Sequence, residues 1–346
     1  MAELVDAHDS KSCGAIHESS ILSPGTIVSL YFKIYSVSAM KDKKIKVIVI
    51  VGPTATGKSD LAIKLARTLG GEVVSADSRQ VYTGLDIGSG KVTPEEMNGV
   101  PHHLLDVVSP KRRSAFTAAE YQKLAQEKIK EISSRGNMPI ICGGTGFYIQ
   151  GAIDNISFPD VRPNTKLRKK LQKMNTEELF VLLKKLDPRR SKNIDKKNSV
   201  RLVRAIEIAT ALGSVPRPAR RPTSPYDPLF IGLDVDTTEL KKKIHTRLLS
   251  RIESGMIEEV RKLHANGVSW KRLESFGLEY RHVACFLQKK VTREKMIERL
   301  EIEIGQFAKR QRVWFKKDKR IHWFTPHESK KILTFVKAQT KKIATQ

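Results

Sequence analysis

The sequence predicts an α/β fold, in which a doubly wound parallel sheet carries a phosphate-binding loop (P-loop) and a helical domain is inserted into it. Three observations support this. An apolar run at residues 44–51 is followed by a glycine-rich loop and a helix-forming stretch. Segments typical of strands and helices then alternate as far as residue 157. From residue 158 to 225 the alternation gives way to basic segments with helical spacing.

The composition bounds the class of protein. The 346 residues are enough for two domains, and the 63 Lys and Arg against 37 Asp and Glu give a net charge of +26. This excess favours a polyanionic partner, although a merely basic or thermally adapted surface is the alternative. Three widely spaced cysteines indicate a reduced cytoplasmic protein without disulfides or structural zinc. No apolar run approaches the roughly 20 residues that span a bilayer, so we expect no membrane partner.

The first 39 residues follow neither the pattern of a signal peptide nor a helical period. A possible coding string for residues 18–23 resembles the T-arm of a tRNA gene, which suggests that a neighbouring tRNA gene was read as protein. We therefore expect residues 1–39 to be a non-native or disordered extension and the native start to be Met40, with an ordinary disordered tail as the alternative.

The clearest motif is GPTATGKS, which lies between the predicted strand at 44–51 and a helix that ends at Gly70. Two glycines let the backbone wrap an anion, and the start of the helix adds positive potential. The lysine supplies a full charge, and the hydroxyl of Ser59 is suited to Mg²⁺. The predicted phosphate-binding residues are Gly52, Pro53, Thr54, Ala55, Thr56, Gly57, Lys58 and Ser59.

The rest of the first core segment, residues 40–157, argues against a motor or signalling ATPase. A second strand ends at Asp77, where open α/β sheets place their chemistry, and no strand ends in the Asp-Glu pair that holds the metal of an ATPase. We expect Ser114 to cap the next helix. The strand MPIICGG then leads into a second glycine-rich turn with Thr145 at its tip.

The second half is basic. Residues 158–225 contain 18 Lys or Arg against 6 Asp or Glu, an excess suited to RNA phosphates. A proline-rich stretch leads back to the sheet, which LFIGLDVD rejoins, so residues 226–326 are expected to complete the core. This part ends in a helix in which basic residues alternate with aromatic ones, a pattern suited to an unstacked base, and in a strand with Trp323 in the core. Residues 327–346 are expected to form a basic tail.

Six motifs in order, GPTATGKS, DSRQVY, GLDIGSGK, PHHLLD, GGTGFY and AKRQ with a following Trp, resemble those of the tRNA dimethylallyltransferases between residues 44 and 324. The resemblance implies a Mg²⁺-dependent, monomeric enzyme without an obligate protein partner. Such an enzyme transfers a dimethylallyl group from dimethylallyl diphosphate to N6 of the adenosine 3′ of the anticodon in tRNA. It also implies that the loop at 52–59 holds the diphosphate of the prenyl donor and that ATP is not consumed.

The resemblance assigns roles to residues of this chain. The catalytic residues would be Asp77 as the base, with Arg247, Thr54 and Lys58 stabilising the diphosphate. The implied tRNA-binding residues are Asp77, Ser78, Arg79, Gln80, Thr145, Arg168, Val200, Arg201, Arg204, Lys309, Arg310, Gln311 and Trp314, with Gln311 meeting the bases. The chain departs from the family pattern at Ile304-Gly305, where Thr-Arg is usual, and at Leu278, where Tyr is usual.

Alternatives remain open at this point. Asp77 is also suited to cap a helix, Arg247 to a solvated position, and the closing segment to a solvated helix with Trp314 in the core. The rival functions are a small-molecule P-loop kinase, a prenyltransferase acting on free adenine nucleotides, and a non-catalytic RNA-binding protein. The basic insert and the AKRQ segment favour an enzyme that acts on tRNA.

Overall fold

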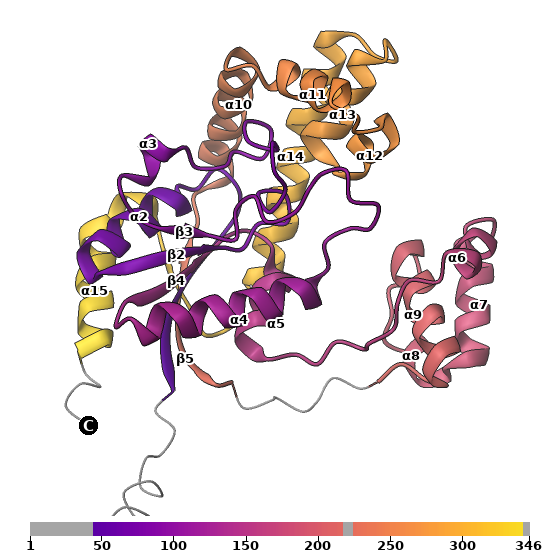
Figure 1. The fold of residues 1–346 in the computed structure, drawn as a ribbon, viewed down its shortest axis with the longest axis horizontal. Coiled ribbons are helices and arrows are strands. Elements are labelled where there is room, and N and C mark those ends of the chain that lie inside the picture. Colours follow the sequence, from indigo (N-terminus) through magenta and orange to yellow (C-terminus); the bar gives the residue numbers. More distant parts are fainter. Residues whose placement is uncertain (1–43, 217–223, 342–346) are drawn as a thin grey trace, which may run out of the picture. The chain divides into compact units, whose positions relative to one another are not determined.

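The computed structural model describes residues 44–216 and 224–341 (Figure 1). The extension expected at residues 1–39 lies outside the described residues. A six-stranded sheet organises the main part, in the order β3-β2-β4-β1-β5-β6, and every neighbouring pair is parallel. The strands are β1 (Ile45–Val51), β2 (Gly71–Ser75), β3 (His102–His103), β4 (Met138–Cys142), β5 (Tyr226–Leu233) and β6 (Ile321–Phe324). The predicted doubly wound parallel sheet is confirmed.

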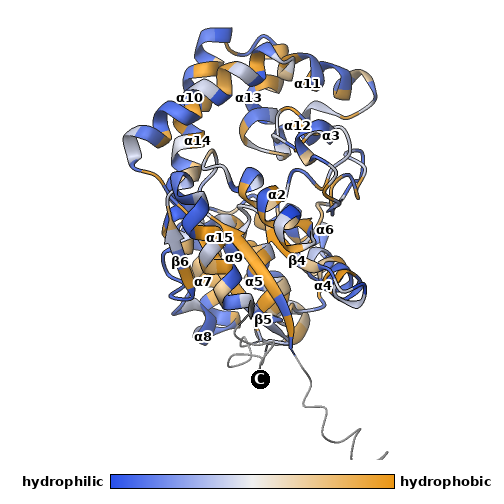
Figure 2. Cartoon of the chain, turned by 90° about the vertical axis from the view of Figure 1, so that its left-hand side faces the viewer, coloured by the Kyte–Doolittle hydropathy of each residue, from blue (hydrophilic) through white to orange (hydrophobic). Residues whose placement is uncertain are grey.

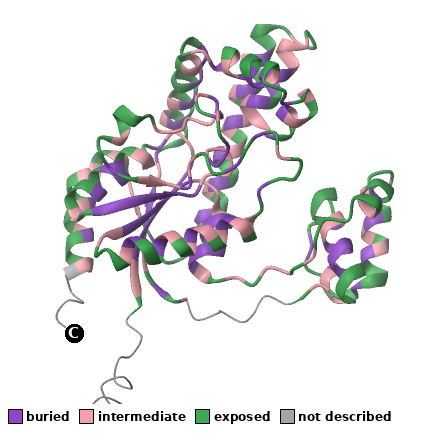
Figure 3. Ribbon diagram, viewed as in Figure 1, coloured by how far each residue is buried: buried purple, intermediate pink, exposed green. Residues whose placement is uncertain are grey.

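The central strand β1 is buried on both faces. Val47, Val49 and Val51 belong to one hydrophobic cluster, whereas Ile48 and Ile50 belong to another. Successive side chains of a strand point to opposite faces, so both faces of the sheet are covered, as is usual for parallel sheets. Figure 3 shows the strands as the buried centre of this part, and Figure 2 shows that they are mainly hydrophobic.

Helices close the two faces. On the Ile48 face lie α2 (Lys58–Leu69) and α15 (Ser329–Lys341), and on the other lie α4 (Ala118–Ser134), α5 (Gly146–Asp154) and α14 (Arg293–Phe315). The position of α15 differs from the expected tail, because its Ile332 and Val336 are completely buried. The core thus extends beyond residue 326, the boundary expected from the sequence. The short elements α3 (Pro94–Met97) and η1 (Pro326–Glu328) complete this part.

The cap of α4 also differs from the prediction. Thr117, and not Ser114, caps the helix, because its hydroxyl accepts a hydrogen bond from the Glu120 amide and its own amide donates one to the Glu120 carboxylate. The hydroxyl of Ser114 instead accepts a hydrogen bond from Arg112.

Four further helices follow β5. Their buried side chains belong to the same hydrophobic cluster as those on the α4 face of the sheet. They are α10 (Thr237–Glu253), α11 (Met256–Ala265), α12 (Trp270–Ser275) and α13 (Leu278–Leu287). The long helix α14 packs on α10 and α13 through Met296, Leu300 and Ile304. The unusual Ile304 is thus a core residue, and the neighbouring Gly305 faces open space.

The predicted insert is helical and has a small core of its own. Its helices are α6 (Thr165–Leu171), α7 (Thr176–Leu186), α8 (Pro188–Ser191) and α9 (Ser199–Leu212). Leu179, Leu183 and Leu202 are buried together in this core. Asparagine side chains cap three of these helices, at Asn164, Asn175 and Asn198.

Candidate active site

The loop between β1 and α2 has the backbone shape of an anion cradle. Gly52 has φ 143°, and a Cβ at this position would lie 2.2 Å from the carbonyl oxygen of Leu233, so no other residue fits there. Gly57 and Ala55 adopt positive φ angles of 77° and 62°. The hydroxyl of Thr56 donates to the carbonyl of Pro53 over 2.9 Å and closes the loop from inside. Residues 52–59 thus form a tightly held turn that leads into the start of α2.

Lys58 lies at the mouth of this turn. Its ammonium donates to the carbonyl of Pro53 over 2.5 Å. The pKa of Lys58 is lowered from 10.5 to about 8 by burial and, to a smaller extent, by the positive charge of Arg247, whereas Cys142 and the Asp77 carboxylate oppose the change. The charges of both Arg247 and Asp77 thus influence Lys58, and the catalytic roles of these three residues stay predictions.

Asp77 follows β2 and shapes the turn that bears it. Its Oδ1 accepts hydrogen bonds from the amides of Arg79 (2.8 Å) and Gln80 (3.4 Å). Its Oδ2 makes no hydrogen bond within the described parts of the chain. The helix-capping alternative is wrong, because no helix begins at Ser78 and Oδ1 of Asp77 closes only the turn at residues 78–80. The other oxygen stays available for a ligand.

The turns after β2 and β4 are joined. The hydroxyl of Thr145 accepts a hydrogen bond from the amide of Ser78 (3.1 Å), and the amide of Thr145 donates to the carbonyl of Ala76 (3.1 Å). A Cβ on Gly143 would lie 2.2 Å from that carbonyl, which explains the glycine. The side chain of Gln80 is also engaged, because it accepts from Ser75 and donates to the carbonyl of Gly90.

Gln311 of α14 connects the P-loop with the second glycine-rich turn. Its Oε1 accepts from the Thr54 amide (2.8 Å), and its Nε2 donates to the Gly144 carbonyl (3.0 Å). The side chain is buried, with 7% of the residue exposed. The predicted contact of Gln311 with RNA bases stays a prediction, and the structure shows a second task that sequence reasoning missed, the joining of two loops.

Close approach of α14 explains two more glycines of GGTGF. A Cβ on Gly144 would lie 2.2 Å from Nε2 of Gln311, and one on Gly146 would lie 2.2 Å from Nε1 of Trp314. The residue Trp314 is 41% exposed, so it is not a core residue. Lys309 and Arg310 are exposed on the same helix. Helix α14 thus carries the buried Gln311, which is hydrogen-bonded to both loops, and also exposed basic and aromatic side chains.

Arg247 lies on α10, next to Gly90 of the loop at 84–91. It is exposed to solvent, yet the surrounding protein, followed by the adjacent Arg251 guanidinium, lowers the pKa of Arg247 to about 10. A Cβ on Gly90 would meet the guanidinium groups of both arginines, so this glycine lets the loop at 84–91 approach them. Sequence reasoning missed Arg251. The glycines of GLDIGSGK were the only local signal that this loop lies close to other side chains.

The predicted RNA contacts of the insert form a separate group. Arg168 and Arg204 both pair with the buried carboxylate of Glu207, at 2.7 and 3.4 Å. Val200 and Arg201 are exposed at the start of α9, and 77% of the Val200 residue is accessible. Two of the four predicted contacts therefore have an internal partner, and two face solvent.

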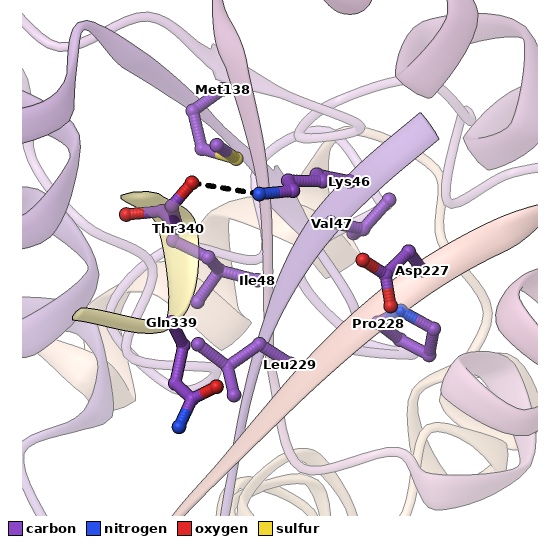
Figure 4. A pocket seen from close by; sticks show the side chains of 9 residues that line it. All are labelled: Lys46, Val47, Ile48, Met138, Asp227, Pro228, Leu229, Gln339 and Thr340. Carbon is purple, nitrogen blue, oxygen red and sulfur yellow. Dashed lines mark hydrogen bonds between the residues drawn. The ribbon is translucent and has the colours of Figure 1, made fainter. Parts of the chain in front are cut away.

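A hollow of about 200 Å³ lies at the opposite edge of the sheet, where β1, β4 and β5 begin (Figure 4). The ammonium of Lys46 there donates to the carbonyl of Thr340 over 2.7 Å and so ties β1 to α15. Asp227 also lines it and is exposed. The hollow lies at the edge of the sheet opposite the P-loop, so substitutions of the residues that line the hollow are useful controls for substitutions at the P-loop edge.

No helix in residues 44–216 and 224–341 is apolar over a sufficient length to cross a membrane. Across the same residues, no cluster of three or more His, Cys, Asp or Glu side chains is arranged to hold a metal ion.

The sequence and the fold of this chain are similar to those of known proteins. Residues 80–318 match the model of the family described as IPP transferase. Among curated relatives, tRNA dimethylallyltransferase 2 of Trichlorobacter lovleyi is 41% identical over 279 residues, 79% of this chain and 90% of the relative. The corresponding enzyme 1 of Syntrophus aciditrophicus is 44% identical over 278 residues, with the same coverage. The crystal structure of the tRNA isopentenylpyrophosphate transferase of Bacillus halodurans matches with a TM-score of 0.66 and 34% identity, over 86% of this chain and 98% of that one.

Proposed function

This chain belongs to the IPP transferase family, and on that premise we propose that it transfers a dimethylallyl group from dimethylallyl diphosphate to N6 of the adenosine 3′ of the anticodon in tRNA. The observation that carries the proposal is the convergence of three loops, those after β1, β2 and β4, which Gln311 and Thr145 hold together. A phosphate cradle and a carboxylate with a free oxygen thereby share one edge of the sheet.

The reaction balances with the residues at this edge. The lone pair of N6 attacks C1 of the dimethylallyl group, a C–N bond forms, and the C1–O bond breaks. The diphosphate leaves with the bonding electrons, and Asp77 takes the proton that N6 releases. An exocyclic adenine amine is a weak nucleophile, so a hydrogen bond from N6 to Oδ2 of Asp77 orients its lone pair and disperses the developing positive charge.

The departing diphosphate gains negative charge, which the P-loop is built to receive. The backbone N–H groups of residues 55–59, the Lys58 ammonium and the Thr54 hydroxyl would contact the diphosphate, and the Arg247 guanidinium would bind it from α10. Fixed donors and charges of this kind supply large catalytic effects, because they need no reorganisation during the reaction. In this proposal the loop holds the diphosphate of the prenyl donor, and ATP is not consumed.

Mg²⁺ fits the same loop through Ser59. The hydroxyl of Ser59 is half-buried at the first turn of α2 and has no hydrogen-bond partner in the described part of the chain. A carboxylate cage is not needed, because Mg²⁺ is commonly held by substrate phosphates, water and few protein ligands. The ion would neutralise part of the diphosphate charge.

RNA binding is assigned to three groups of residues. Ser78, Arg79 and Gln80 follow Asp77, and Thr145 is hydrogen-bonded to Ser78, so these residues would contact the target nucleotide. Lys309, Arg310 and Trp314 on the exposed side of α14 offer phosphate contacts and a stacking surface. The insert contributes Val200 and Arg201, with Arg168 and Arg204 shared with Glu207.

One assay separates this function from its rivals. The protein is incubated with labelled dimethylallyl diphosphate, tRNA, AMP and ATP, and the labelled product is identified. We expect label in tRNA, with or without ATP, and a fall of about 100- to 10,000-fold in kcat for Asp77→Asn, the usual range for a lost general base.

Asp227→Asn is the matched control, because Asp227 is exposed at the opposite edge of the sheet, and its activity should equal that of the native protein. Label on AMP alone would indicate the nucleotide prenyltransferase, and phosphate transfer from ATP would indicate the kinase. Tight tRNA binding without any transfer would indicate the non-catalytic alternative.

A further inference from the structure

A second arginine, Arg251, lies one helical turn after Arg247 on α10. The Nη1 of Arg251 forms an ion pair with Glu279 (3.2 Å) and donates to the carbonyl of Gly88 (3.2 Å). Only 14% of each side chain of this pair is exposed. Arg251 is thereby anchored between the loop at 84–91 and the first turn of α13, beside the unusual Leu278.

The guanidinium groups of Arg247 and Arg251 are close neighbours. Their Nη2 atoms lie 2.4 and 1.7 Å from the position that a Cβ on Gly90 would occupy, so they are at most about 4 Å apart. The two residues are four apart on α10, where like charges repel each other. Glu279 compensates one of the two charges, and no carboxylate in the described chain forms an ion pair with Arg247.

The loop against which Arg251 rests is itself fixed. The carboxylate of Glu259 accepts hydrogen bonds from the amides of residues 86, 87 and 88, at 2.6 to 3.1 Å. The Tyr280 hydroxyl donates to the same carboxylate, and Gln80 donates to the carbonyl of Gly90. The loop cannot yield easily, so repulsion between the two arginines acts on the more exposed Arg247.

We propose that Arg251, anchored by Glu279 and the Gly88 carbonyl, is a positioning residue that directs the Arg247 guanidinium toward the diphosphate of the prenyl donor. This inference rests on the proposed function. The pair of arginines leaves one positive charge unbalanced, which a diphosphate oxygen neutralises. Glu279 keeps Arg251 from competing for the ligand.

The test measures KM for dimethylallyl diphosphate, the inhibition constant of inorganic pyrophosphate, KM for tRNA and kcat. For Arg251→Met we expect the first two constants to rise about tenfold or more, as for one misdirected charge-assisted hydrogen bond, while KM for tRNA stays unchanged. Arg251→Lys should restore part of the affinity, because it keeps the charge.

A double-mutant cycle identifies the route of the effect. In an Arg247→Gln background, Arg251→Met should add little, because a positioning residue acts through its partner. The exchange Arg251→Glu with Glu279→Arg keeps the ion pair and tests folding. It should melt near the native temperature and retain the raised KM for the prenyl donor.

Two outcomes overturn the inference: a lower melting temperature of Arg251→Met with unchanged constants for both diphosphates, or effects of the two arginine variants that multiply independently. The proposed function fails separately, if the native protein neither transfers the prenyl group nor is inhibited by pyrophosphate. If the native protein is active and the Arg251→Met variant has unchanged constants for both diphosphates, only the proposed role of Arg251 is contradicted.

Discussion

The side-chain amide of Gln311 accepts a hydrogen bond from the backbone amide of Thr54 over 2.8 Å, across 257 positions of sequence. This bond fixes the P-loop to helix α14, which also bears the exposed residues Lys309, Arg310 and Trp314. RNA that bound to α14 would therefore act on the loop through one side chain.

Gln311→Ala should weaken both the fold and donor binding. It leaves the Thr54 amide and the Gly144 carbonyl without their partner, which costs about 1–3 kcal/mol in the free energy of unfolding. Urea denaturation and KM for dimethylallyl diphosphate measure the effects. Gln306→Ala, on an exposed position of the same helix, is the control, and equal behaviour of the two variants would contradict the assignment.

Gly144→Ala should resemble Gln311→Ala, because the new Cβ would lie 2.2 Å from Nε2 of Gln311 and displace it.

Gly305→Ala should have the opposite effect on stability. A Cβ there meets nothing within 4 Å, so the substitution should stabilise α14 by about 0.5–1 kcal/mol. Thermal unfolding of the two variants checks both signs, and a destabilised Gly305→Ala would show that the glycine has another purpose.

Donor binding should weaken as the pH rises through about 8. Lys58 has a lowered pKa of about 8, mainly because of burial, so its ammonium is charged below that pH and neutral above it. A diphosphate favours the charged form, and its affinity therefore falls on the alkaline side. Inhibition by inorganic pyrophosphate across this range measures the effect.

The matched variant for that experiment is Lys58→Arg. A guanidinium stays charged, so the alkaline loss should disappear even where the overall affinity is reduced. Persistence of the same alkaline loss in this variant would assign it to a different group.

Replacing Lys309 and Arg310 together by Gln should reduce the steepness with which tRNA affinity declines with salt. Each lost phosphate contact lowers the slope of log affinity against log salt by about one. KM for the prenyl donor should not change. Lys337→Gln, an exposed lysine on α15, is the control, and an equal change of slope in both proteins would remove α14 from the RNA interface.

Local patterns predicted the parts of the site that are continuous in sequence. The loop at 52–59 and the turn at Asp77 follow strands whose apolar runs are visible in the sequence, so their place at the carboxyl edge of the sheet follows from the fold. The helical insert was predicted equally well from apolar spacing, because its core is formed by helices that are close in sequence.

Contacts between distant segments were not predictable in the same way. The burial of Gln311, the Arg251–Glu279 pair and the packing of α15 each depend on residues from separate elements. A polar glutamine or a lysine-rich helix has no local feature that announces such a contact. Ser114 and Thr117 are both good capping residues, and the choice between them depends on Glu120, three residues after Thr117.

The most direct test of the account is a crystal structure of the protein with an unreactive thio analogue of dimethylallyl diphosphate and an anticodon stem-loop. We predict the diphosphate oxygens at hydrogen-bond distance from backbone N–H groups of residues 55–59, from Lys58 and from Arg247, with N6 of the target adenosine against Asp77. A diphosphate bound elsewhere, or a target amine remote from Asp77, would contradict it.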